Sequence, residues 1–173
     1  PSLLAVPSMF QAARMVAEVL REVIEQHADT GQRADSTFNA TLILGGQIKG
    51  GPHRLFLIYP EGNFIEAAED TPFFQIGETK YGRPILVRAY EPDMSFEAAM
   101  KLLLVSFDST LKANLTVGAP FDFHCYDADS LKTGRTGRVA SDDAYFQKVS
   151  EGWGEALRDA LDMLPEFTLG PTP

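Results

Sequence analysis

The segment Arg54–Tyr59 constrains the fold most, because a strand with this sequence is apolar on both faces. Leu55 and Leu57 would lie on one face and Phe56 and Ile58 on the other, since successive side chains of a strand point in opposite directions. A strand of this kind needs cover on both sides. The sequence therefore predicts a layered protein in which helices pack on sheets.

Two further strands flank this segment at short, turn-forming connections. Residues 38–48 begin with the alternation Phe38, Ala40, Leu42 and continue through a glycine pair, and Phe64–Ala68 follows the turn at 60–63. Connections this short favour an antiparallel meander. A fourth strand is predicted at residues 121–126, where apolar and polar side chains alternate again.

Helical spacing of apolar residues accounts for most of the remaining chain. It predicts a helix over about 9–27 after a Ser8 cap, a short one over 83–89, and a longer one from the Ser95 cap to about Asn114. A last helix follows, with Ser141 as its cap and Asp142 and Asp143 in its first turn. Pro165 would end it.

Two segments between these elements carry expectations of their own. Lys132–Arg138 is basic and rich in glycine, which predicts an exposed loop. Leu102, Leu104 and Val105 widen the apolar stripe of the third helix beyond one face, which favours burial against another helix or another subunit.

The order α-β-β-β-α-α-β-α predicts an α+β fold with four strands and grouped helices. A length of 173 residues favours a single domain over residues 1–173.

Charge and cysteine content exclude several classes of function. The chain has 15 basic and 24 acidic residues, a net charge of −9, so nucleic acid and anionic membrane surfaces are not expected partners. Cys125 is the single cysteine, which excludes an internal disulfide and favours a reducing compartment such as the cytoplasm. No apolar run is long enough to span a membrane.

No complete catalytic or metal-binding pattern follows from spacing alone. The histidines, at positions 27, 53 and 124, lack metal-ligand spacing, and no phosphate-binding glycine loop is present, so no metal and no cofactor are expected. His124 and Cys125 are adjacent on a predicted strand and therefore face opposite ways, which leaves Cys125 as a small core residue. Pro1 could act as a basic amine, but the surface helix that follows at once gives it no pocket.

Three stretches together resemble the Anbu family of bacterial proteasome-like proteins, relatives of the proteasome β-subunits. They are Gly45–Asn63, Phe73–Leu86 and Ser106–Gly118, and Ile76–Gly82 is the most specific part. The likeness covers nearly the whole chain. It implies a four-layer αββα sandwich of the N-terminal-nucleophile hydrolase class, here a single proteasome-like domain lacking its N-terminal strands. It also implies self-assembly into a ring-like or spiral homo-oligomer.

The activity implied by the resemblance is peptide-bond hydrolysis by an N-terminal threonine or serine whose own α-amine serves as the base. That nucleophile would lie before Pro1, so this chain as it stands is expected to be inactive. The alternative is a ring, scaffold or binding protein that keeps the fold without the chemistry.

The resemblance also suggests residues that would support the terminal amine. Gly77 and Glu78 stand where the family carries a glycine and a serine. Asn114 and Val117, before Gly118, stand where it carries an acidic residue and a serine. The residues themselves leave simpler roles open: Glu78 facing solvent or capping the helix at 83, and Asn114 merely ending its own helix.

Overall fold

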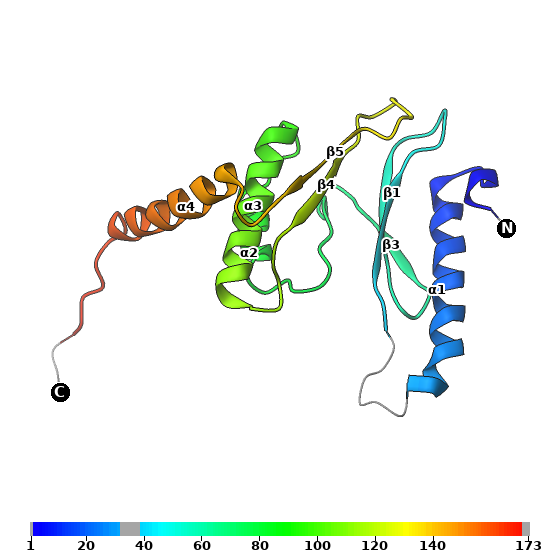
Figure 1. Cartoon of the computed structure of the whole chain (residues 1–173), viewed down its shortest axis with the longest axis horizontal. Helices are drawn as coiled ribbons and strands as arrows, with labels where there is room; N and C mark the ends of the chain where they lie inside the picture. The colour runs from blue at the N-terminus through cyan, green and yellow to red at the C-terminus, as the bar shows by residue number, and fades with distance from the viewer. Residues whose placement is uncertain (1, 32–38, 171–173) are drawn as a thin grey trace. The chain divides into compact units, whose positions relative to one another are not determined.

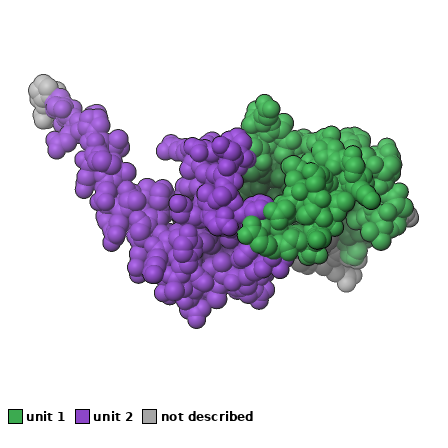
Figure 2. All heavy atoms as spheres, turned by 90° about the horizontal axis from the view of Figure 1, so that it is seen from above, with its two compact units in different colours: residues 1–77, 124–135 green, residues 78–123, 136–173 purple. Residues whose placement is uncertain are grey.

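The computed structural model describes residues 2–31 and 39–170, with side chains of 28–31 excepted (Figure 1). The chain divides into two compact units (Figure 2). Unit 1 comprises residues 1–77 and 124–135, and unit 2 comprises residues 78–123 and 136–173. The single domain expected from the chain length stays a prediction.

Unit 1 consists of one long helix and a three-stranded sheet. A short 3-10 helix, Leu3–Ala5, precedes α1, Met9–Gly31. Ser8 caps α1 as predicted, its Oγ accepting a hydrogen bond from the Gln11 backbone N–H at 3.2 Å. The antiparallel strands β1, Leu42–Gly46, β2, Arg54–Ile58, and β3, Phe64–Glu66, follow in the order β1-β2-β3.

The core of unit 1 lies between α1 and one face of this sheet. Phe56 and Ile58 of β2 are fully buried, and Ala13 and Ala17 of α1, equally buried, let the helix approach them closely. On the opposite face of the sheet, Ile43 and Ile65 are 38% and 42% exposed. Within unit 1, α1 therefore covers only one of the two apolar faces of β2.

A hydrogen-bond network centred on Gln47 joins two turns of unit 1. The Gln47 amide nitrogen donates to the Gly51 carbonyl at 2.8 Å and to Asp129 Oδ1 at 2.7 Å. Its amide oxygen accepts from the Tyr126 hydroxyl and the Asp129 backbone N–H, both at 2.8 Å. Both ends of one side chain are thus used, which fixes the turn after β1 against residues 126–129.

Unit 2 contains the other helices, α2, Arg83–Ala89, α3, Phe96–Ala113, and α4, Ala144–Asp162. Its buried core is formed by four apolar residues from α3, α4 and the strands β4, Phe121–Cys125, and β5, Arg135–Val139: Leu104, Phe121, Val139 and Phe146. Phe121 stacks on Phe107 with ring centroids 4.5 Å apart and meets Phe146 edge-on at 5.4 Å.

The predicted loop at Lys132–Arg138 is wrong, because most of it forms β5, which pairs with β4. Arg138 binds the Asp122 carboxylate of β4 through two hydrogen bonds of 2.6 and 2.8 Å. Gly137 is required by packing, since a Cβ there would lie 2.4 Å from the Phe123 ring. A glycine that looked like a loop marker is thus a site of close contact within a hairpin.

Other boundaries differ in smaller ways. The last helix begins later than predicted, because Asp143 rather than Ser141 caps it, its carboxylate accepting from the backbone N–H groups of Tyr145 and Phe146 at 2.9 Å. The first strand is shorter than the predicted span 38–48, and Phe38 lies outside the described residues. The α+β class and the predicted positions of the four helices are confirmed.

Candidate functional site

The loop before α2 presents the carboxylate of Glu78 to the C-terminal end of α3. Glu78 Oε1 accepts a hydrogen bond from the Lys80 backbone N–H at 2.9 Å, which closes a tight turn. Glu78 Oε2 accepts from the Asn114 side-chain amide at 3.0 Å. Two of the residues that the resemblance singles out, Glu78 and Asn114, are therefore in direct contact, although 36 positions separate them in the sequence.

Asn114 connects this carboxylate to the loop that leads to β4. Its backbone N–H donates to the Thr110 carbonyl at 2.8 Å and so ends α3. Its side-chain oxygen accepts from the backbone N–H of Thr116 at 2.9 Å and from the Thr116 hydroxyl at 2.7 Å. Asn114 thus holds Glu78 with one end of its amide and orders the following loop with the other.

The hydrogen bonds lower the pKa of Glu78 below its ordinary value. The largest cause is the Lys80 backbone N–H, followed by the Asn114 amide, and both stabilise the charged carboxylate. Glu78 is partly exposed. At neutral pH the site therefore presents a negative charge that can accept a hydrogen bond from a cation.

The neighbouring candidate positions shape the backbone of the two loops. Gly77 has φ +79°, a conformation that side-chain-bearing residues rarely adopt. The Val117 backbone N–H donates to the Asn114 carbonyl at 3.3 Å, whereas Gly118 is exposed and has open space around its Cβ position. Gly77 and Gly118 contribute no side chain to the site.

Of the simpler roles, capping by Glu78 is wrong, and the helix-ending role of Asn114 is present but is not its only role. The N-cap of α2 is Gly82, and no side chain caps this helix. Asn114 does end α3, in addition to binding Glu78. The helix-ending role is therefore not an alternative to the contact but part of the same arrangement.

Gly82 fixes the position of the loop that carries Glu78. A Cβ at Gly82 would lie 2.2 Å from Ser106 Oγ and 3.1 Å from Thr110 Oγ1, so α2 begins directly on the surface of α3. This close packing explains why position 82 is a glycine. Gly82 is the last residue of the Ile76–Gly82 segment, the part of the chain on which the resemblance rests most.

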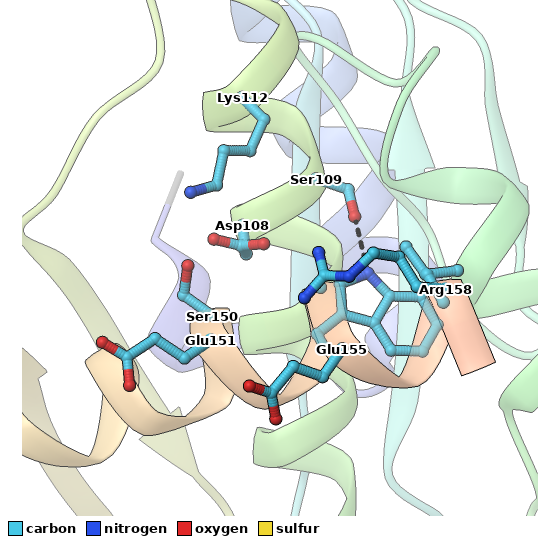
Figure 3. Close-up of a pocket in the computed structure, with 10 residues that line it drawn as sticks. Asp108, Ser109, Lys112, Ser150, Glu151, Glu155 and Arg158 are labelled. Atoms are coloured by element: carbon cyan, nitrogen blue, oxygen red, sulfur yellow. Dashed lines mark hydrogen bonds between the residues drawn. The ribbon is translucent and has the colours of Figure 1, made fainter.

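A second concave site, not foreseen from the sequence, lies between α3 and α4 and has a volume of about 600 Å³ (Figure 3). Asp108, only 5% exposed, lines it together with Lys112 of the same helix. The Trp153 indole N–H donates to Ser109 Oγ at 3.2 Å and so joins α4 to α3 beside it. The available signal was Asp108 itself, the one charged residue in the stretch Leu102–Leu111. Three carboxylates and two cationic side chains line the hollow, which gives it a charged, polar wall.

Metal ligands and a cysteine dyad find no support in the part of the chain that is described. Across residues 2–31 and 39–170, no group of three or more His, Cys, Asp or Glu side chains could hold a metal ion. The His124 ring nitrogen Nε2 donates to the Thr133 carbonyl across the β4–β5 turn, and Cys125 is partly buried. Pro1 lies outside the described residues. No helix among the described residues is both long and apolar enough to cross a membrane.

The proteasome subunit family model matches residues 10–122 of the chain. A mutant of Anbu from Hyphomicrobium sp. strain MC1 is 48% identical, with a TM-score of 0.87, and the match covers 98% of this chain and 70% of that one. The chain belongs to the Anbu family of proteasome subunits.

Two further Anbu structures agree with this assignment. Anbu (ancestral beta-subunit) from Yersinia bercovieri is 47% identical, with a TM-score of 0.87 and coverage of 98% of this chain and 70% of that one. The helical assembly of the Anbu complex from Pseudomonas aeruginosa is 44% identical, with a TM-score of 0.86 and coverage of 95% and 68%. No curated protein matches the chain significantly.

Membership in the Anbu family confirms the predicted fold class, the α+β fold of proteasome-type N-terminal-nucleophile hydrolases. It also places the Glu78 loop and the end of α3 in a proteasome-type subunit. The roles of Glu78 and Asn114 in Anbu chemistry stay predictions.

Proposed function

We propose that this chain is a subunit of a self-assembling, proteasome-like complex of the Anbu type. In the intact protein a threonine or serine that precedes Pro1 hydrolyses peptide bonds, with Glu78 and Asn114 supporting its α-amine. The hydrogen bond between Glu78 and Asn114 carries the proposal, because it joins two of the positions that the family resemblance selects. The helical assembly recorded for the Pseudomonas aeruginosa relative, 44% identical, supports self-association.

The chemistry follows from the charge of the pair. A hydroxyl is a weak nucleophile until a nearby base takes its proton, and a terminal α-amine can serve as that base. The amine becomes an ammonium when it takes the proton, and a carboxylate close to it favours this charged form. Glu78, whose pKa is lowered, provides such a carboxylate, and Asn114 holds it in place.

The exchanged positions of the two groups favour the catalytic function over a scaffold. The resemblance implies a hydroxyl at position 78 and a carboxylate at position 114, whereas this chain has Glu78 and Asn114. This chain therefore keeps one carboxylate and one neutral hydrogen-bonding group, but the carboxylate is at position 78 and the neutral group, an amide, is at position 114.

The mature N-terminus of the natural gene product tests the catalytic part. We expect intact mass and N-terminal sequencing to find an exposed threonine or serine upstream of Pro1. A mature protein whose first residue has no hydroxyl would leave the scaffold as the function. The proposed substrate is a peptide, and the proposed reaction needs no cofactor. The single cysteine suits a reducing compartment such as the cytoplasm.

Light scattering tests the assembly independently. We expect particles several times the mass of one subunit at micromolar concentration. A stable monomer under the same conditions would refute self-assembly even if the N-terminus carried a threonine.

A further inference from the structure

Asp108 is a nearly buried acidic residue whose carboxylate has no partner. The residue is 5% exposed and lines the hollow between α3 and α4 (Figure 3). No hydrogen bond or ion pair joins its carboxylate to any residue that the structure describes. Buried polar groups in folded proteins almost always have a partner. Both oxygens of Asp108 are therefore acceptors available to a ligand that enters the hollow.

The wall beside Asp108 combines an aromatic ring with further oxygen acceptors. The partly exposed indole of Trp153 is held by its hydrogen bond to Ser109 Oγ, at 3.2 Å. Ser150 and Glu151 of α4 add a hydroxyl and a second carboxylate to the same wall (Figure 3). A guanidinium group stacks on aromatic rings and donates hydrogen bonds in its own plane, so it suits a wall of this composition.

The free carboxylate matches a guanidinium group better than it matches an ammonium group or a metal ion. A guanidinium group presents two parallel N–H donors, which match the two oxygens of one carboxylate. An ammonium group is a compact point charge without this planar fork. Over the part of the chain that the structure describes, no group of three or more His, Cys, Asp or Glu side chains could hold a metal ion.

Two cationic side chains of the hollow suit an anionic group on the same ligand. Lys112 of α3 and Arg158 of α4 line the hollow, and both are exposed. Neither makes an ion pair with a described residue. Arginine carries a guanidinium group at one end and a carboxylate at the other, and a hollow of about 600 Å³ has room for a ligand of this size.

We propose that the hollow between α3 and α4 binds free arginine or the carboxy-terminal arginine of a short peptide. Asp108 accepts the two parallel hydrogen bonds of the guanidinium group, and Lys112 or Arg158 binds the carboxylate of the ligand. The site lies within unit 2 and uses neither Glu78 nor Asn114. It is therefore independent of the proposed peptidase chemistry, and the failure of either proposal leaves the other standing.

Calorimetric titration of the intact protein with small probes tests the ligand class. Arginine should bind saturably, and argininamide, which lacks the carboxylate, should bind several-fold more weakly. Citrulline, in which a neutral urea group replaces the guanidinium group, should not bind measurably. Tighter binding of glycyl-arginine than of arginine would identify the peptide as the source, and the reverse would identify the free amino acid. No saturable binding of either, or equal binding of citrulline, would overturn the proposal.

Asp108→Asn tests the named acceptor, because it keeps the size of the side chain and removes its charge. Arginine binding should weaken by about tenfold or more, since a charge-assisted hydrogen-bond pair is lost. Asp159→Asn is the matched control, the same exchange at an exposed position of α4 that does not line the hollow, and it should leave binding unchanged. Equal arginine affinities of the two variants would overturn the proposal.

Filling the hollow tests the site without changing Asp108. Gly154 lines the hollow, and a Cβ there would have only Arg158 Nη1 nearby, at 3.8 Å. Gly154→Gln should therefore fold, because glycine is a poor helix former, and should abolish arginine binding. Gly152→Gln is the matched control, since Gly152 has open space around its Cβ position and does not line the hollow. Arginine binding that is equally tight in both variants would overturn the proposal.

Trp153 provides a second readout at the site itself. It is the single tryptophan among the 173 residues, and it lines the hollow. Its fluorescence should change with arginine concentration and give the same affinity as calorimetry, and Trp153→Phe should remove that change. Calorimetric binding of arginine without any change in Trp153 emission would place the bound arginine elsewhere and overturn the proposal.

Discussion

The side-chain amide of Asn114 donates to the Glu78 carboxylate across 3.0 Å and joins the loop before α2 to the end of α3. The same amide group orders the loop before β4 through Thr116. A charged residue is in this way held at a fixed place on the surface of unit 2. Replacing either partner should loosen two loops at once.

The stability contributed by Glu78 should depend on pH with a definite sign. Its folded-state pKa is lowered, so the contribution is present above the ordinary glutamate pKa of about 4.3 and is lost as the pH falls through the lowered value. We expect the melting temperature of Glu78→Gln to fall below that of the unchanged protein at pH 7, and the difference to shrink as the pH falls below the ordinary glutamate pKa. Thermal unfolding followed by circular dichroism across this range measures the difference.

A double-mutant cycle assigns this effect to the named pair. Asn114→Ala removes one of the two hydrogen bonds that lower the Glu78 pKa, so the effect of Glu78→Gln should shrink in that background. An unchanged effect of Glu78→Gln, with and without Asn114, would show that the contact contributes nothing.

Gly82→Ala should destabilise unit 2 by about 1–3 kcal/mol, the usual cost of overpacking. The added Cβ would lie 2.2 Å from Ser106 Oγ and 3.0 Å from the Ser106 carbonyl oxygen, and backbone cannot move as freely as a side-chain end. Denaturant unfolding measures the loss, and Gly118→Ala, at an exposed glycine with open space, is the control. Adding Ser106→Ala should recover part of the stability; equal stabilities of Gly82→Ala and Gly118→Ala would contradict the close packing.

Gln47→Ala should destabilise the protein by about 1–3 kcal/mol, because it leaves partners of a partly buried network without their hydrogen bonds. The residue donates to Gly51 and Asp129 and accepts from Tyr126 and Asp129. Tyr126→Phe removes only one bond to Gln47 and should cost less in the same denaturant measurement. A larger loss from Tyr126→Phe would place the centre of the network elsewhere.

Local signals in the sequence were sufficient for the helices. Ser8 and Ser95 cap α1 and α3 because their hydroxyls precede runs of apolar residues at helical spacing, and Pro84 fits the first turn of α2. Gly134 and Gly137 misled for a physical reason. One has φ +77° and the other lies under the Phe123 ring, and a sequence distinguishes neither from a loop glycine.

The candidate site was only partly accessible to sequence reasoning. Family resemblance selected Glu78 and Asn114, but their hydrogen bond depends on how α2 and α3 pack, which Gly82 decides. The hollow beside Asp108 and Trp153 forms from two helices that lie far apart in the sequence, so no local pattern predicts it.

Covalent labelling of the intact protein tests the central claim most directly. A β-lactone is opened by an activated hydroxyl and leaves a stable ester, so it should add once per subunit, at the N-terminal threonine or serine. Peptide mapping by mass spectrometry locates the adduct, and Glu78→Gln should slow its formation about tenfold or more, corresponding to at least about 1.4 kcal/mol in activation free energy. Absence of any adduct at the terminal residue of a correctly processed, assembled protein would contradict the proposed peptidase.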